Sequence, residues 1–216
     1  MKLVIGDKNY SSWSMRPWLL MRQAGISFDE ISVELGEAST PARILQYSPS
    51  CKVPCLITDE GQSVWESLAI SETLAERFPE LALWPRDPAA RAHARSVASE
   101  MHGGFGELRS AMWMNIRAKW PGANATPGAL ADIARIDAIW SECVARYGGP
   151  FLFGASFTIA DAMYAPVVMR FNTYAPKLSE AASAYARHIT ALPAVREWIE
   201  SALRETHRLD KYETPQ

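Results

Sequence analysis

The sequence has few cysteines and lacks the spacings that metal sites and disulfide frameworks need. Only 3 of its 216 residues are cysteine, and no two of them form a Cys-x-x-Cys pair. Cys51 and Cys55 have no matching pair of Cys or His that would complete a zinc site. We therefore predict reduced thiols, no disulfide and no metal, with Cys51 and Cys55 as small buried hydrophobic residues.

Net charge and long hydrophobic runs are also nearly absent. The formal net charge is only -2, which gives no electrostatic footprint for nucleic acid or an anionic membrane. No apolar run approaches the roughly 18 residues of a membrane span. The first residues turn polar after Ile5, too early for the apolar core of a signal peptide. We therefore expect a cytoplasmic protein with no nucleic-acid or membrane partner.

The first third of the chain alternates between strand and helix patterns. Apolar residues that recur every second position predict strands, and those that recur every third or fourth predict helices. The predicted elements are a strand over 2–5, a helix over 15–24 ended by Gly25, a strand over 28–35, a short helix opened by Ser39-Thr40-Pro41, a hairpin over 53–67 that turns at Asp59-Glu60-Gly61, and a helix over 67–78. Their order is βαβ followed by ββα.

The remainder of the chain has helical patterns only. Three prolines between Pro79 and Pro88 interrupt the periodicity, and we place a domain boundary there. The predicted helices cover 89–119, 127–147 with an end at Gly148-Gly149-Pro150, 160–171, and two further stretches up to Arg204. The sequence thus predicts an α/β domain over 1–80 and an all-helical domain over 88–216.

Four short motifs add to this order of elements. They are the turn Asn9-Tyr10-Ser11-Ser12-Trp13-Ser14 before Arg16, the pair Val53-Pro54, the pair Glu66-Ser67, and Gly-Ala-Ser-Phe-Thr-Ile-Ala-Asp over 154–161. With these motifs in this order, the sequence resembles the cytosolic glutathione transferases over essentially its whole length. The resemblance implies a thioredoxin-like first domain, glutathione as co-substrate and a two-fold homodimer.

The serine-rich turn is the first candidate for chemistry, although no histidine lies nearby to activate a serine nucleophile. A hydroxyl that donates to the sulfur of glutathione favours the thiolate, whereas a free thiol has a pKa of about 8.5. In serine-type relatives the donor lies a few residues before the first-helix arginine, which implies Ser11, with Ser12 as the neighbouring alternative. We assign helix capping to Ser12 or Ser14. Trp13 stands where cysteine-type relatives carry their reactive thiol.

The other two motifs of the first domain imply a binding site for glutathione. The proline at the position of Pro54 is cis in thioredoxin-like domains, which implies that the main chain of Val53 pairs with the cysteinyl unit. Glu66 and Ser67 precede a helix, whose N-terminus favours the γ-glutamyl carboxylate. From the sequence alone, a plain cap by Ser67 with Glu66 exposed is an equally good interpretation. Lys52 is either a partner of the glycyl carboxylate or a solvated flank.

The binding pocket for the second substrate is the part of the site that the sequence indicates least clearly. Tyr10 and Trp13 are candidates for one wall of its pocket. Phe105, Met112 and Trp113 are candidates for the other, although such residues at helical spacing usually face the core. Gly103-Gly104 weakens that helix and marks a kink or a close approach. Thr158 and Asp161 form a capping-box pair, so we leave Asp161 out of the active site.

Three functions fit these residues. The first is conjugation of glutathione to a small electrophile. The second is glutathione-dependent isomerisation of a cis-unsaturated diacid, of the maleylacetoacetate isomerase kind, and a basic pocket that includes Arg109 or Arg117 favours it. The third is a non-catalytic binding protein of the same fold, which has no need for a serine donor or for Glu66-Ser67.

Overall fold

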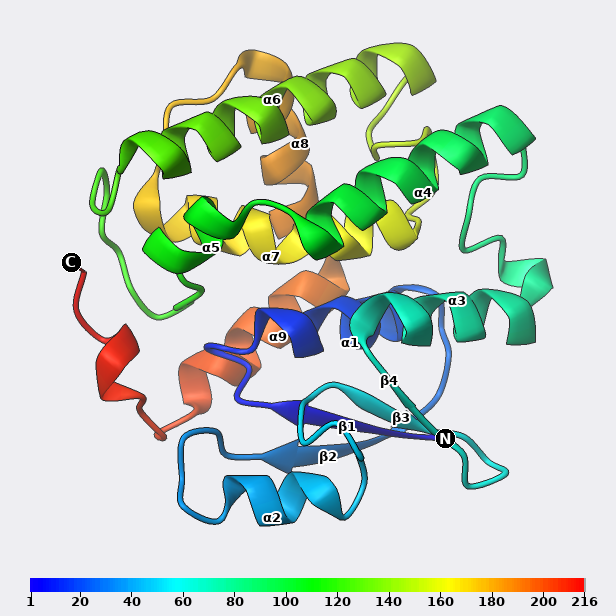
Figure 1. Ribbon diagram of the computed structural model, residues 1–216. Coiled ribbons are helices and arrows are strands. Elements are labelled where there is room, and N and C mark those ends of the chain that lie inside the picture. The colour runs from blue at the N-terminus through cyan, green and yellow to red at the C-terminus, as the bar shows by residue number, and fades with distance from the viewer. Residues whose placement is uncertain (216) are drawn as a thin grey trace.

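The structure is a computed structural model that describes residues 1–215. A small sheet with its helices lies below a set of longer helices in Figure 1. The elements are β1 (Lys2–Gly6), α1 (Ser12–Gln23), β2 (Asp29–Val33), α2 (Thr40–Leu45), β3 (Cys55–Ile57), β4 (Ser63–Trp65), α3 (Ser67–Arg77), α4 (Pro88–Gly103), α5 (Gly106–Ala111), α6 (Pro127–Tyr147), α7 (Ile159–Tyr174), α8 (Glu180–Ala191) and α9 (Pro193–Arg204). The predicted order βαβ-ββα followed by helices is confirmed.

The sheet has the strand order β2-β1-β3-β4, in which β1 is parallel to β2 and antiparallel to β3. Alternate residues of β1 face opposite sides. Leu3 and Ile5 join the main core with α1 and α3, whereas Val4 packs with Ile44 of α2 in a smaller cluster. This is why β1 is an almost continuous apolar run, and why α2 lies on the opposite side of the sheet from α1 and α3 (Figure 1).

The two parts of the chain share one hydrophobic core, because α1 packs against α7 and α9. Trp18 of α1 meets Trp198 of α9 with ring centroids 5.0 Å apart. Helix α7 is buried along almost its whole length. The packing of α1 on α7 brings the serine turn at the start of α1 beside residues of the helical part.

The predicted helix over 89–119 is wrong. Helix α4 ends at Gly103, Gly104 is extended, and Phe105 adopts the left-handed conformation with φ of 57°. A short α5 follows, and residues 112–126 are not helical. The two consecutive glycines are the physical reason, because each costs about 1 kcal/mol in a helix interior relative to alanine.

The capping box at the start of α7 is confirmed. Asp161 is completely buried and accepts hydrogen bonds from the N–H of Thr158 at 2.9 Å and of Leu152 at 3.0 Å. It also accepts from the hydroxyl of Tyr185 at 3.2 Å. The carboxylate therefore ties α7 to the preceding loop and to α8. Over residues 1–215, no helix is long and apolar enough to cross a lipid bilayer.

Candidate functional site

A cavity of about 540 Å³ opens at the N-terminal end of α1. Its walls come from the serine turn, α2 and the segment before it, the segment before β3, α5 and the segment after it, α7 and the end of the chain. The lining residues are Tyr10, Ser11, Ser12, Trp13, Leu35, Thr40, Ile44, Cys51, Lys52, Val53, Arg109, Trp113, Met114, Arg170, Leu209 and Tyr212. A smaller cavity of about 230 Å³ adjoins it, shares Trp13, Lys52 and Val53 with it and adds Ser50, Pro54 and Glu66. Of these two adjoining cavities, the one at the N-terminal end of α1 is called the larger cavity below. Most of the predicted site residues therefore meet here.

The serine turn is fixed before the helix begins, because the N–H groups of Tyr10 and Ser11 both donate to the Asp7 carbonyl. Ser11 is the N-cap of α1, and its Oγ accepts a hydrogen bond from the N–H of Ser14 at 3.4 Å. The Ser11 hydroxyl donates to Ser14 Oγ at 2.7 Å. The prediction that Ser12 or Ser14 caps the helix is therefore wrong.

The side chain of Ser12 is hydrogen-bonded to a residue of the helical domain. Its Oγ accepts a hydrogen bond from Nη2 of Arg170 on α7 at 3.2 Å. Both side chains are buried and both line the larger cavity. Burial and the nearby charge of Arg109 lower the pKa of Arg170 to about 10, so it remains a cation at neutral pH.

The start of α3 carries a buried hydroxyl without a partner. Glu66 is the N-cap, has φ of 68° and makes no side-chain capping bond. Ser67 is the first helical residue and is completely buried, and its Oγ has no hydrogen-bond partner in residues 1–215. Capping of α3 by Ser67 is therefore wrong, whereas Glu66 is exposed, as the plain-cap interpretation predicted. An unpaired hydroxyl at a helix N-terminus fits an anionic group such as a carboxylate.

The segment before β3 joins the two cavities. The Val53-Pro54 peptide is cis, as predicted. Lys52 is exposed and lines both cavities. Cys51 is only half-buried and faces the larger cavity, so its prediction as a buried residue is wrong, whereas Cys55 is buried. Burial raises the pKa of the Cys55 thiol, as expected for an unreactive core residue.

Trp13 lies among cationic side chains. The guanidinium carbon of Arg16 is 4.1 Å from the centroid of its ring and that of Arg109 is 5.3 Å away. Arg16 is completely buried, and its guanidinium nitrogens have no hydrogen-bond partner within the described chain. Burial and the charge of Arg170 lower the pKa of Arg16 well below its ordinary value. Positive charge concentrated beside the serine turn favours an anionic ligand.

The predicted wall of the second pocket needs correction. Trp113 and Tyr10 line the larger cavity, whereas Phe105 and Met112 do not line it and pack in the hydrophobic core. The break at Gly104 and Phe105 separates α4 from α5, so the helical spacing assumed for these residues does not continue across it. Leu209 and Tyr212, near the end of the chain, line the cavity instead.

The arginines are also distributed differently from the prediction. Arg109 lines the cavity, whereas Arg117 lies after α5 and donates to the carbonyl of Glu205 at 2.5 Å and to the hydroxyl of Tyr10 at 2.7 Å. Arg170 was not predicted as a site residue, although its position in the sequence gives a signal. It is the only charged residue in the apolar stretch 162–171 of α7, and such a residue is seldom fully buried without a function or a partner.

Residues 205–215, which we call the C-terminal strap, contribute Leu209 and Tyr212 to the lining of the larger cavity. The hydroxyl of Tyr10 donates to Glu213 and accepts from the N–H of Leu209 at 3.2 Å. The indole N–H of Trp113 donates to the carbonyl of Tyr212 at 3.0 Å. Near the start of the strap, Glu205 accepts hydrogen bonds from the N–H groups of residues 8 and 9 at 2.7 and 2.9 Å.

His207 fastens the strap to the first domain. Its Nδ1 lies 2.7 Å from Asp7 and its Nε2 lies 3.2 Å from Glu37. Although burial opposes the charged form, the hydrogen bond to Asp7 raises the pKa of His207. A raised histidine pKa gives stability that is complete below the unfolded pKa of about 6.5 and is lost as the pH rises through the folded pKa.

His207→Gln is therefore expected to lower the unfolding free energy by about 1 kcal/mol below pH 6.5 and by less at alkaline pH. Denaturant titrations of wild type and variant, below pH 6.5 and again at alkaline pH, measure the two differences in unfolding free energy. His93→Gln is the control, because His93 pairs with the hydroxyl of Tyr147 instead of a carboxylate. A deficit that grows as the pH rises would contradict the assigned ion pairs.

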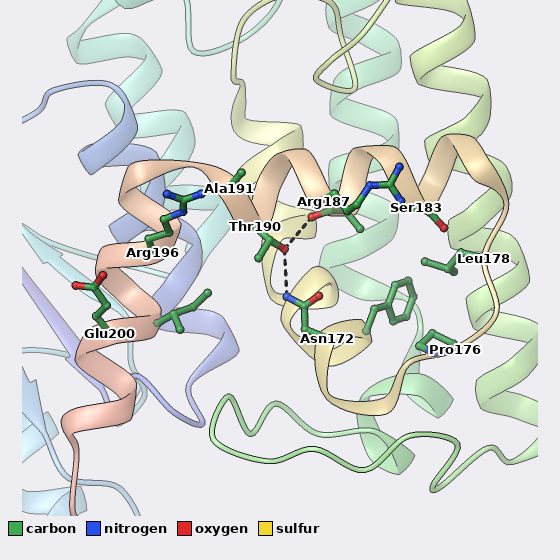
Figure 2. Close-up of a pocket in the computed structure, with 12 residues that line it drawn as sticks. Asn172, Pro176, Leu178, Ser183, Arg187, Thr190, Ala191, Arg196 and Glu200 are labelled. Carbon is green, nitrogen blue, oxygen red and sulfur yellow. Dashed lines mark hydrogen bonds between the residues drawn. The ribbon is translucent and has the colours of Figure 1, made fainter.

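A third cavity, of about 550 Å³, lies away from the serine turn and from the two adjoining cavities, between the end of α7, α8 and α9 (Figure 2). Inside it, Asn172 donates to Thr190 Oγ1 at 3.1 Å, and the Thr190 hydroxyl donates to a carbonyl of its own helix. Arg187, Arg196 and Glu200 are exposed at its edge. Because its polar groups are solvated or already paired, this cavity has less to recognise a ligand than the first.

Comparison with known proteins agrees with this fold. The family model described as the glutathione S-transferase N-terminal domain matches residues 10–77, and that of the C-terminal domain matches residues 88–201. The chain therefore belongs to the glutathione S-transferase family. In residues 1–215, no group of three or more His, Cys, Asp or Glu side chains is placed to hold a metal ion.

Curated relatives carry two kinds of name. The chain is 28% identical to glutathione S-transferase GstB of Escherichia coli over 212 residues, which cover 91% of this chain and 97% of that protein. It is 27% identical to a probable maleylacetoacetate isomerase of Caenorhabditis elegans over 172 residues, which cover 78% and 77%. The maleylacetoacetate isomerase of Pseudomonas aeruginosa is 35% identical over 124 residues, or 56% and 57% of the two chains.

Solved structures show the same fold. A Burkholderia glutathione transferase homolog with bound glutathione superposes with a TM-score of 0.71 at 22% identity, covering 94% of this chain and 98% of that one. A glutathione transferase from Methylococcus capsulatus gives a TM-score of 0.71 at 24% identity, covering 93% and 98%. The fold is a thioredoxin-like domain followed by a helical domain.

Proposed function

We propose that this chain is a serine-type glutathione transferase that joins glutathione to a small electrophilic or hydrophobic substrate. The observation that carries the proposal is the convergence of the serine turn, residues 52–54 and Glu66 on two adjoining cavities. We also propose a division into domains over 1–80 and 88–216 and assembly as a homodimer, as the family resemblance implies.

The residues present fit glutathione. The buried Ser67 hydroxyl lacks a partner within residues 1–215, and with the free N–H groups of α3 it suits the γ-glutamyl carboxylate. Glu66 at the same helix start suits the γ-glutamyl ammonium. The main chain of Val53, before Pro54, would pair with the cysteinyl unit, and Lys52 would face the glycyl carboxylate.

The serine turn supplies the activation. A hydroxyl of Ser11 or Ser12 donates a hydrogen bond to the sulfur and stabilises the thiolate relative to the thiol, while the thiol proton passes to solvent. The N-terminus of α1 adds a favourable field. In conjugation, a bond forms between sulfur and the electrophilic carbon, and the leaving group departs with its electron pair. Proximity of the two reactants supplies the remainder of the rate increase.

Replacing Glu66 by alanine tests the binding site. We expect Glu66→Ala to raise the Kd for glutathione about 10- to 100-fold, or about 1.5–3 kcal/mol, because a charge-assisted hydrogen bond is lost. Calorimetry measures the Kd, and circular dichroism checks that the helix content is unchanged. Glu76→Ala is the matched control, because Glu76 is exposed on the same helix. Equal Kd values for Glu66→Ala and wild type would remove Glu66 from the site.

Isomerisation of an unsaturated diacid is the second candidate, and one observation favours it. The larger cavity is lined by Lys52, Arg109 and Arg170 and by no carboxylate side chain within residues 1–215. In such a reaction the sulfur adds to the cis double bond, the resulting single bond rotates, and elimination of the sulfur restores the double bond in the trans form. Glutathione is regenerated, and cationic side chains would hold the two carboxylates.

A further inference from the structure

The two serines of the turn differ in what their hydroxyls already do. Ser11 Oγ donates its proton to Ser14 Oγ at 2.7 Å and accepts from the N–H of Ser14. Ser14 Oγ also accepts from the N–H of Gly6 at 3.0 Å, so both of its lone pairs are occupied. The proton of Ser11 is therefore committed to fixing the start of α1.

Ser12 has the opposite arrangement. Its Oγ accepts from Arg170 Nη2 at 3.2 Å, and its own proton has no acceptor within residues 1–215. A serine hydroxyl has one proton and two lone pairs, so the arginine occupies one lone pair and leaves the proton available. Ser12 lines the larger cavity, where an incoming sulfur would find that proton.

Arg170 is rigidly placed for this contact. It is 4% exposed, and its Nε donates to the carbonyl of Met112 at 2.9 Å. Its Nη1 donates to the carbonyl of Pro166 at 3.3 Å. With these two bonds the guanidinium plane is fixed, and only Nη2 is directed at Ser12. A charged donor also polarises the hydroxyl that it binds and strengthens that hydroxyl as a donor.

We infer that Ser12 is the hydroxyl that donates to the glutathione sulfur, and that Arg170 is the positioning residue that directs it from the helical domain. This rests on the proposed function and identifies its catalytic residue. No bond to Ser12 is made or broken: Ser12 keeps its proton and donates it as a hydrogen bond to the sulfur. Tyr10 is a poor alternative, because its hydroxyl already donates to Glu213 of the strap.

The test is the pKa of the glutathione thiol when bound, measured by ultraviolet difference absorbance at saturating glutathione. In wild type we expect a pKa well below the free value of about 8.5. Ser12→Ala is expected to return it to about 8.5, and Ser12→Thr, which keeps a hydroxyl, to restore most of the shift. Ser11→Ala is expected to lower the melting temperature by about 2–4 °C as a lost N-cap and to leave the thiol pKa low.

Arg170 is tested in the same assay by a double-mutant cycle. Arg170→Gln should raise the thiol pKa in the wild-type background and change it little when Ser12 is already alanine, because Arg170 acts through Ser12. Equal increases in both backgrounds would show a direct effect of its charge and would overturn the positioning role. If Arg170→Gln does not fold, Arg170→Lys retains the charge without the fixed fork of donors, and an unchanged thiol pKa would overturn the role as well.

The outcomes separate this inference from the proposed function. A thiol that titrates near 8.5 in wild-type protein would overturn both. A lowered thiol pKa in wild type that persists in Ser12→Ala, and is lost in Ser11→Ala, would overturn the inference and leave the proposed function intact.

Discussion

Replacing Asp161 by alanine is expected to lower the unfolding free energy by about 3–5 kcal/mol, because several buried donors lose their acceptor together. These are the N–H groups of Leu152 and Thr158 and the hydroxyl of Tyr185, which lie 2.9–3.2 Å from the carboxylate. The melting temperature should fall by roughly 10 °C. Glu180→Ala is the control, since Glu180 is an exposed acidic residue in the first turn of α8, and we expect it to cost under about 1 kcal/mol.

Asp161 also makes the free energy of unfolding depend on pH, in a direction that its raised pKa fixes. Burial raises the pKa of Asp161 to about 6, despite its four hydrogen bonds. Between the unfolded value of about 3.9 and this folded value, the native state holds a proton that the unfolded state has released. The contribution of Asp161 to stability therefore decreases as the pH rises through this window. The advantage of wild type over Asp161→Asn in denaturant titrations should shrink from about pH 4 to pH 7, and an advantage that grows would contradict the assignment.

Features that depend on neighbouring residues could be predicted from the sequence. The capping box needs only Thr158 and Asp161 three positions apart, and the structure has both of its bonds. Helix α6 begins at Pro127 and ends before Gly148, which adopts φ of 84° as a helix-ending glycine. The order of strands and helices followed from local periodicity in the same way.

The parts of the site that depend on tertiary contacts could not be predicted. Phe105 and Met112 have the right residue types for a pocket wall, but the left-handed Phe105 ends the helical spacing on which that prediction rested, and both side chains lie in the core. The strap has no periodic pattern, and its place beside the cavity comes from single hydrogen bonds such as that between Trp113 and Tyr212. The N-cap of α1 was predicted at Ser12 or Ser14 and lies at Ser11. The hydrogen bonds from the serine turn to the Asp7 carbonyl fix where α1 starts, and local sequence does not show them.

The charge of Arg109 distinguishes the two candidate reactions. Arg109 lines the larger cavity, and its guanidinium lies over the ring of Trp13 at 5.3 Å, close to the serine turn. Its Nη1 donates to the carbonyl of His102 at 3.1 Å, which fixes the direction of the side chain. A substrate with two carboxylates would lose a charge-assisted contact if this guanidinium were removed, whereas a neutral electrophile would lose little more than packing.

Arg109→Ala is therefore expected to lower kcat/KM for glutathione-dependent isomerisation of a cis-unsaturated dicarboxylate about 30- to 1000-fold, which corresponds to about 2–4 kcal/mol. The value for conjugation of a neutral aryl halide should fall less, so that the ratio of the two changes at least about 10-fold. Arg187→Ala, in the exposed cavity of Figure 2, is the control for loss of a positive charge. If both activities fall by the same factor in Arg109→Ala, the arginine serves the fold or glutathione binding, and the basic pocket no longer argues for an acidic substrate.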